Sequence, residues 1–204
     1  ELDPITLGSS RTNGRIITSY IDWAIKEGYR KNNINPLKTV QSEWFNQFVN
    51  KKRKLFITDQ ELEEIEAHCI NAQDAVIVRA LFEGLTTSEL LNLKKTDVDY
   101  ENGILKLKDD KKGERTLKVS EQCLKLIRQA SEEIQYYKNN GHISEGTRRE
   151  WTELVDNEYV LRSSITRTKK IGRADEFLIY RRLDTIKKTL GFPYLTSKNI
   201  YNSG

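Results

Sequence analysis

The stretch LFEGLTTSELLNLKKTDVD, residues 81–99, has the residue pattern of a phosphate-binding turn between two helices. Gly84 follows an apolar run, at the place where a helix C-cap favours glycine. Thr86 stands three residues before Glu89, which is the spacing of a capping box that opens the next helix. Free amide groups at such a helix start can hold an anion. Thr86 and Thr87 are therefore candidate phosphate contacts, and helix capping alone is the simpler interpretation of Thr86.

Basic residues gather in two segments, residues 51–54 (KKRK) and residues 161–191, although the formal net charge is only +4. Residues 161–191 carry nine Lys or Arg against three acids, whereas residues 55–103 carry eleven acids against three Lys or Arg. This asymmetry favours an anionic partner, most often nucleic acid, although a solvated basic surface would give the same pattern. The candidate DNA contacts in the two basic segments are Lys51, Lys52, Arg53, Lys54, Arg162, Arg167, Lys169, Lys170 and Arg173.

Little in the sequence indicates a metal, redox or membrane function. Cys69 and Cys123 fall in apolar helical patterns, which predicts buried, reduced thiols. His68 and His142 have no ligand partners at metal-binding spacing, so we expect no metal and no cofactor. No signal peptide or long apolar run is present, which predicts a cytoplasmic protein and no membrane contact. Because the sequence has no methionine, we expect it to be a fragment of a longer protein.

Apolar periodicity predicts a mainly α-helical fold with one small antiparallel β-hairpin. Helices are expected near residues 17–27, 58–69, 72–82, 86–93, 120–137, 174–190 and 196–202. In the first of them, Ile17, Tyr20 and Ala24 share one apolar stripe. Residues 103–120 are expected to form the hairpin, with a polar turn containing Gly113.

Four segments of the chain match one large family in the same order. The segment quoted above and the following YENGILKL resemble a Gly-Leu-Arg turn, a Ser-Glu-Leu helix, an Asp-Ile-Asp loop and a first hairpin strand. DDKKGERTLKVS resembles the rest of that hairpin, and YLTSKNIYNSG a segment with a His-x-x-Arg pair. SYIDWAIKEGYRKNNINPL is similar to the end of a helical core-binding domain. The chain thus resembles the tyrosine recombinases (phage integrases). The resemblance implies the end of a core-binding domain at 1–36, a linker at 37–54 and a truncated catalytic domain at 55–204.

The resemblance also implies a site for phosphodiester chemistry, from which this chain departs. In the family a tyrosine attacks the phosphodiester, two arginines hold its non-bridging oxygens, and a lysine and a histidine manage protons. Thr86 replaces the first arginine, Lys198 the histidine and Tyr201 the second arginine. The hairpin lysine maps near Asp110 or Lys111, and the tyrosine nucleophile would lie beyond the last residue. We therefore predict a protein that binds DNA without cleaving it, and hence no enzyme activity.

This pattern predicts a sequence-specific duplex-DNA-binding protein, used as a phage or prophage repressor in a bacterial host cell. The resemblance adds self-association through a C-terminal region beyond residue 204. One alternative is a divergent but active integrase, and another is an interaction module that no longer binds DNA. The clustered basic residues argue against the last. The remaining candidate DNA contacts are Lys111, Lys112, Lys198, Asn199 and Tyr201, for which turn and packing roles are the simpler interpretations.

Overall fold

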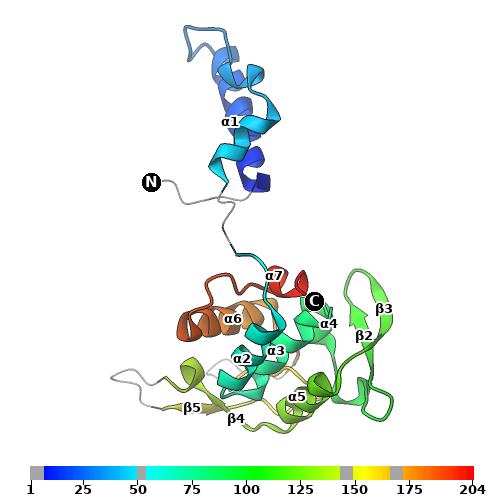
Figure 1. Ribbon diagram of the computed structural model, residues 1–204. Helices are drawn as coiled ribbons and strands as arrows, with labels where there is room; N and C mark the ends of the chain where they lie inside the picture. Colours follow the sequence, from blue (N-terminus) through cyan, green and yellow to red (C-terminus); the bar gives the residue numbers. More distant parts are fainter. Residues whose placement is uncertain (1–6, 50–53, 143–148, 166–171) are drawn as a thin grey trace. The chain divides into compact units, whose positions relative to one another are not determined.

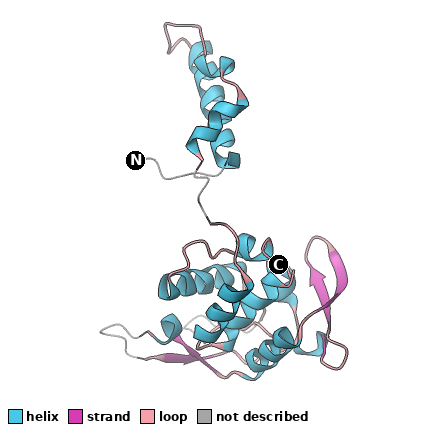
Figure 2. Cartoon of the chain, viewed as in Figure 1, coloured by secondary structure: helices cyan, strands magenta, loops and turns pink. Residues whose placement is uncertain are grey.

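The computed structural model describes residues 7–49, 54–142, 149–165 and 172–204 (Figure 1). The chain divides into two compact units, residues 1–54 and residues 55–204. This division falls where the sequence places the start of the second domain. Helices form most of the described residues of the N-terminal unit and are the main regular structure of the C-terminal unit (Figure 2).

The N-terminal unit consists of helix α1 (Leu7–Lys26) and two 3₁₀ helices, η1 (Pro36–Thr39) and η2 (Ser42–Phe48). The Ser10 hydroxyl on α1 donates a hydrogen bond to the Phe45 carbonyl of η2 at 3.1 Å. A Cβ at Gly14 would lie 2.3 Å from the Phe45 ring, so glycine permits this close approach. Residues 37–48 therefore belong to the folded N-terminal unit, and the prediction of a linker over this stretch is wrong.

The apolar stripe predicted on α1 is present, but much of it lies at the surface of the N-terminal unit. Ile17 is 50% exposed and Tyr20 is 64% exposed, whereas Ala24 is buried. The ring of Trp23 lies 5.7 Å from that of Tyr20 and 5.4 Å from that of Tyr29, measured between centroids. Trp23 of α1 thus packs on Tyr20 of the same helix and on Tyr29, which follows the helix.

Helix α3 lies at the centre of the C-terminal unit. The α-helices of this unit are α2 (Asp59–His68), α3 (Ala72–Phe82), α4 (Thr87–Asn92), α5 (Glu121–Glu132), α6 (Glu176–Leu190) and α7 (Ser197–Tyr201). Two 3₁₀ helices, η3 (Lys95–Asp97) and η4 (Lys138–Gly141), lie in the connections. Helices α2, α5, α6 and α7 all pack on α3, whose Val76, Ile77 and Val78 are fully buried. The apolar composition of residues 72–82 predicts such a central helix.

The strands form two small antiparallel sheets (Figure 2). In the first, β1 (Val98–Asp99) pairs with β2 (Ile104–Asp109), which pairs with β3 (Gly113–Lys118). The second joins β4 (Gln135–Tyr137) to β5 (Trp151–Glu153). Leu105 and Leu107 of β2 are buried, so one face of the hairpin lies on the helical core. The predicted fold class, mainly helical with a small antiparallel hairpin, is confirmed, and the β4–β5 pair is an addition.

The prediction that the helix opened by Ser120 runs to about Tyr137 is wrong. Its backbone turns extended at Glu133 (φ −61°, ψ 130°), and the following residues form β4. The Glu133 carboxylate accepts hydrogen bonds from the amides of Ala72 (3.0 Å) and Gln73 (2.9 Å), at the start of α3. The helix therefore stops where its next side chain caps another helix, a contact between residues some 60 positions apart.

Candidate nucleic-acid interface

The turn between α3 and α4 has the local structure that its sequence predicts. Gly84 adopts a positive φ of 91°, which lets the chain leave α3 sharply. The Thr86 hydroxyl accepts a hydrogen bond from the Glu89 amide at 3.2 Å, and the Glu89 carboxylate accepts one from the Thr86 amide at 2.8 Å. The capping box is thus complete.

The hydroxyl proton of Thr86 is engaged within the protein. Thr86 Oγ1 donates to Asp109 Oδ2, at the end of β2, over 3.0 Å. Asp109 also accepts hydrogen bonds from the amides of Lys111 (2.8 Å) and Lys112 (3.0 Å). These amides, followed by the Thr86 hydroxyl, hold the pKa of Asp109 below its ordinary value. Since a hydroxyl has one proton, the expected donation from Thr86 to a phosphate does not fit this arrangement.

Arg115 on β3 takes part in the same turn, and the family resemblance gave no reason to single it out. Its Nε and Nη2 atoms donate to the two Glu89 carboxylate oxygens at 2.6 and 2.9 Å. Nη2 also donates to the Gly84 carbonyl at 2.7 Å. Burial alone would raise the pKa of Glu89, but the hydrogen bonds from Arg115 and Thr86 outweigh it and lower that pKa. The sequence did hold a signal, because Arg115 lies two residues before Leu117 and strand alternation therefore puts both on one face of the hairpin. In the structure Arg115 pairs with Leu107 across the hairpin.

The tip of the hairpin is fastened to α4 and to Arg173. The Asp110 amide donates to the Ser88 hydroxyl at 3.1 Å, and the Asp110 carboxylate accepts from the Asn92 side-chain amide at 3.0 Å. Arg173, a predicted DNA contact, forms an ion pair with Asp110 at 3.0 Å. Asn92 first, and then Arg173, lower the pKa of Asp110. The Arg173 guanidinium is thus already bound to a carboxylate of the protein itself.

Two adjoining cavities of about 230 and 220 Å³ lie between α4, the hairpin turn and α7. Both are lined by Thr86, Lys112 and Tyr201. The first is completed by Leu81, Thr87, Ser197 and Lys198, and the second by Glu89, Gly113, Glu114 and Arg115. Figure 1 shows α4, α7 and the β2–β3 hairpin on one side of the C-terminal unit. We call this pair of cavities the turn hollow.

The turn hollow brings together several residues that the sequence singled out separately. Lys198 is exposed and Tyr201 is 41% exposed, so both side chains reach its surface. Lys112 lines it, whereas the sequence placed the hairpin lysine near Asp110 or Lys111. Asn199, also predicted to contact DNA, donates its side-chain amide to the Tyr194 carbonyl at 2.8 Å, which is a structural contact within the C-terminal region.

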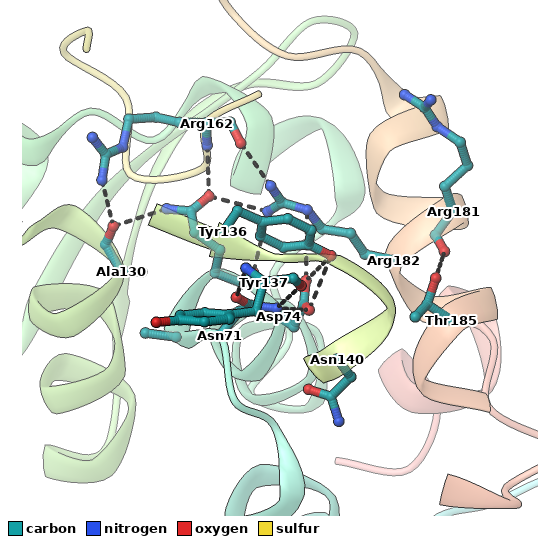
Figure 3. Close-up of polar contacts among 12 residues, drawn as sticks. Asn71, Asp74, Ala130, Tyr136, Tyr137, Asn140, Arg162, Arg181, Arg182 and Thr185 are labelled. Carbon is teal, nitrogen blue, oxygen red and sulfur yellow. Dashed lines mark hydrogen bonds and ion pairs between the residues drawn. The ribbon is translucent and has the colours of Figure 1, made fainter. Parts of the chain in front are cut away.

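The prediction that Arg162 contacts DNA is overturned by the burial of this residue. Arg162 is only 4% exposed. Its Nη2 donates to the Ala130 carbonyl at 2.9 Å (Figure 3). Nη2 also donates to the carbonyls of Ser131 (3.2 Å) and Glu133, at the C-terminal end of α5. A cation there satisfies free carbonyls and complements the negative end of the helix dipole. Burial lowers the pKa of Arg162, which shows how far its guanidinium is removed from solvent.

Several predicted contacts lie outside the described residues. They are Lys51, Lys52, Arg53, Arg167, Lys169 and Lys170. Lys54, the last residue of the N-terminal basic run, is described and exposed, as is Lys111.

Both cysteines belong to helical parts of the C-terminal unit, with Cys69 at the end of α2 and Cys123 in α5. Cys123 is buried, as predicted, whereas Cys69 is only partly buried, and burial raises the pKa of both thiols. Within the described ranges, no three His, Cys, Asp or Glu residues are grouped so as to hold a metal ion. None of the helices over these same ranges is long and apolar enough to cross a membrane.

The sequence of the C-terminal unit matches a known protein family. The family described as MrpR, C-terminal catalytic domain, matches residues 56–204. The chain belongs to this MrpR family. It is 36% identical to the SPbeta prophage-derived uncharacterized protein YopR of Bacillus subtilis over 208 residues, covering 99% of this chain and 63% of YopR. It is 28% identical to the probable integrase/recombinase protein MJ0367 of Methanocaldococcus jannaschii over 198 residues, covering 79% of this chain and 59% of that protein.

Solved structures show that this MrpR-family chain has the tyrosine-recombinase fold, as the resemblance implied. The XerA recombinase superposes with a TM-score of 0.51 at 17% identity, over 98% of this chain and 67% of XerA. The Tn1549 transposon integrase, in complex with a circular intermediate DNA, superposes with a TM-score of 0.52 at 14% identity. That match covers 98% of this chain and 66% of the integrase. The chain therefore spans about two thirds or less of the proteins it matches.

Proposed function

We propose that this chain is the DNA-binding part of a phage or prophage regulator, built on a recombinase fold that no longer cleaves DNA. The observation that carries the proposal is the set of contacts around Thr86. Where the recombinase resemblance calls for an arginine, a threonine hydroxyl is bonded to Asp109. The nearest guanidinium, that of Arg115, is held by Glu89 in a two-pronged ion pair.

The loss of cleavage follows from the charge that phosphoryl transfer develops. Removing one preorganised donor to such charge typically slows an enzyme about 10²- to 10³-fold. Here Thr86 and Tyr201 stand in the two arginine positions and Lys198 in the histidine position. Asp109 adds a carboxylate within hydrogen-bond distance of Thr86, which would repel a phosphate placed there. Several catalytic contributions are thus missing at once, although such effects do not simply add.

DNA binding is supported by the residues that remain at the turn hollow. Lys112, Lys198 and Tyr201 line it. All three can contact a DNA phosphate whether or not the protein cleaves DNA. The relative YopR is SPbeta prophage-derived by name, and the Tn1549 integrase was solved with DNA. Together these support duplex DNA as the partner and a prophage setting, and regulation is the use that we propose for binding without cleavage.

The decisive experiment separates binding from covalent chemistry. Full-length protein would be incubated with duplexes from its own genomic region, including a suicide substrate that traps phosphotyrosine adducts. We expect a shifted band on a native gel and no shifted band on a denaturing gel. A reproducible covalent band would show an active recombinase, and no native shift at low salt would remove the DNA-binding proposal.

One observation favours a divergent but active recombinase as the second candidate. The hairpin turn still presents a lysine, Lys112, beside Thr86 and Tyr201, where the family carries its catalytic lysine. Because the chain covers 63% of YopR and 59% of MJ0367, the activity of the whole protein also depends on sequence outside these residues. The denaturing gel decides between the two candidates.

A further inference from the structure

A larger cavity lies away from the turn hollow, between α6 and the β4–β5 pair. Its volume is about 410 Å³, within the range of pockets that bind small molecules. Its lining residues are Tyr136, Lys138, Thr152, Ser163, Ser164, Asp175, Leu178, Arg181, Arg182 and Thr185. None of these residues lines the turn hollow. We call this cavity the α6 pocket.

The inner wall of the α6 pocket is a fixed polar network. Arg182 donates to Gln73 Oε1 at 3.0 Å and to the Arg162 carbonyl at 2.8 Å, and its Nε lies 3.5 Å from an Asp74 carboxylate oxygen. Its guanidinium also lies over the Tyr136 ring, 4.5 Å from the centroid, and the Tyr136 hydroxyl bonds to Asp74 (Figure 3). Burial raises the pKa of Asp74, and the neighbouring Arg182 opposes that rise. Arg182 is therefore a rigid cation at the back of the pocket.

Two further cations on the wall have no such partner. Arg181 donates through Nε to the Phe177 carbonyl at 3.3 Å, and over the described residues neither it nor Lys138 forms an ion pair. The one carboxylate on the wall, Asp175, accepts from the Leu178 amide at 3.1 Å as the N-cap of α6. With Arg182 paired to Asp74, the described wall carries two cations, Arg181 and Lys138, against the single carboxylate of Asp175, which is an excess of positive charge.

A buried hydroxyl on the same wall also lacks a partner. Thr152 Oγ1 is buried and makes no hydrogen bond to any described group. Such a group is unfavourable when it is unsatisfied, so buried hydroxyls in folded proteins are nearly always bonded. Ser163 and Ser164 bring two more hydroxyls to the pocket. Cations combined with several hydroxyl donors suit an anion with three or four oxygens better than a planar carboxylate.

We propose that the α6 pocket binds a small phosphorylated molecule, with Arg181, Lys138 and Thr152 contacting its phosphate. Leu178 and the Tyr136 ring offer apolar surface to the rest of the ligand. The pocket is larger than a phosphate ion requires, which leaves room for that portion. This site is separate from the turn hollow and does not depend on the DNA-binding proposal.

The test uses inorganic phosphate as the probe and the whole chain as the protein. Titration calorimetry at constant ionic strength, with chloride replaced by phosphate, gives the affinity. Arg181→Gln removes an exposed cation and should weaken phosphate binding about tenfold, equivalent to about 1.4 kcal/mol. Thr152→Val, which keeps the side-chain shape, should weaken it severalfold. Lys188→Gln, on the same helix but outside the pocket, should leave it unchanged. Lys198→Gln measures any phosphate that is held at the turn hollow instead.

The outcomes decide between a free ligand and DNA as the source of phosphate. Unchanged affinity in Arg181→Gln, or loss in Lys198→Gln alone, would overturn the proposal. A duplex that displaces phosphate, together with weaker duplex binding by Arg181→Gln, would also overturn it in favour of a DNA phosphate. Phosphate binding that duplex leaves intact, and that Arg181→Gln weakens, supports the free ligand.

Discussion

At the scale of single residues, Thr86 contacts both Glu89 at the start of α4 and Asp109 on the hairpin. The Thr86 hydroxyl both caps α4 and bonds to Asp109, so it ties the helix to the hairpin. An arginine at this position would form an ion pair with the adjacent Asp109 carboxylate, and its guanidinium would then be less available to a phosphate. The other carboxylate of the turn, that of Glu89, is already paired with Arg115. Asp109, Glu89 and Arg115 are thus all bonded within the turn, whereas phosphoryl transfer requires cations that are free to contact the phosphate.

Thr86→Arg should therefore not restore cleavage, since Lys198 and Tyr201 still stand where the resemblance calls for a histidine and an arginine, and such groups act as a unit. The new guanidinium should pair with Asp109, leaving the salt dependence of DNA binding nearly unchanged. Loss of the cap should lower the free energy of unfolding by about 1 kcal/mol. Adding Asp109→Asn should free the guanidinium and steepen the salt slope by about 0.9. Binding titrations at several salt concentrations, with a cleavage assay, measure each effect.

The ion pair of Glu89 gives a prediction about pH. Its folded-state pKa lies below the ordinary 4.5, so the pair stabilises the fold above that value and loses this effect as pH falls through the folded-state pKa. Glu89→Gln should lower the free energy of unfolding by about 1–3 kcal/mol at pH 7, because a buried bonded charge is lost. The difference from the unsubstituted protein should shrink below about pH 4. Denaturant unfolding at pH 7 and at acid pH tests this, with exposed Glu114→Gln as the control. A difference that does not vary with pH would contradict it.

At the scale of elements, the sequence predicted what depends on neighbouring residues. The capping box at Thr86 was readable from spacing and is confirmed. Thr58 and Ser120 cap helices that start where the apolar periodicity predicts, and the left-handed Gly191 ends α6 where that periodicity ends. The end of α5 was not, because Glu133 caps a helix some 60 residues earlier in the chain. No local pattern distinguishes a glutamate that continues a helix from one that caps a distant one.

The same limit explains why the sequence predicts Arg162 as a DNA contact, although its side chain is buried. It lies in a basic stretch, and only the folded structure shows that its guanidinium reaches the end of α5 (Figure 3). The candidate site was predicted in part for a related reason. Thr86, Lys198 and Tyr201 came from motif positions, whereas Arg115 and Asp109 matter through hairpin register, which pairs residues across the turn.

Arg162→Met should lower the free energy of unfolding by about 2–4 kcal/mol, because the last carbonyls of α5 lose a charged donor in a buried site. Its DNA affinity, measured below the unfolding transition, should be unchanged. Lys125→Met, an exposed substitution on the same helix, should alter stability by less than about 0.5 kcal/mol. Thermal and denaturant unfolding provide the measurement. A stable Arg162→Met protein with weakened DNA binding would return this arginine to the interface.

At the scale of the whole molecule, the placement of charge matters more than its total. A net charge of +4 is modest for a chain of 204 residues that we propose binds DNA. The acids of residues 55–103 are largely internal partners, such as Glu66 with Arg79 and Glu89 with Arg115. Cations such as Lys112 and Lys198 remain exposed at the turn hollow. An anionic partner would therefore meet a more positive surface than composition alone indicates.

This distribution predicts how DNA affinity should vary with salt. Replacing Lys112 and Lys198 by alanine should weaken binding to specific and random duplexes by similar factors, because phosphate contacts carry no sequence information. The slope of log affinity against log salt should flatten by about 0.9 for each phosphate that the protein no longer neutralises. Replacing Arg167, Lys169 and Lys170 by alanine should have the same kind of effect if that basic segment meets the DNA backbone.

The control for these variants is Lys188→Ala, which removes an exposed lysine paired with Asp184 on α6, away from the turn hollow. Its slope should match that of the unsubstituted protein, because this lysine neutralises no phosphate. A comparable flattening in Lys188→Ala would mean that general charge, and no defined surface, governs binding. An unchanged slope in the Lys112 and Lys198 variant would move the DNA away from the turn hollow. Flattening by both the hollow and the loop variants, and not by the control, would place two separate parts of the fold on one duplex.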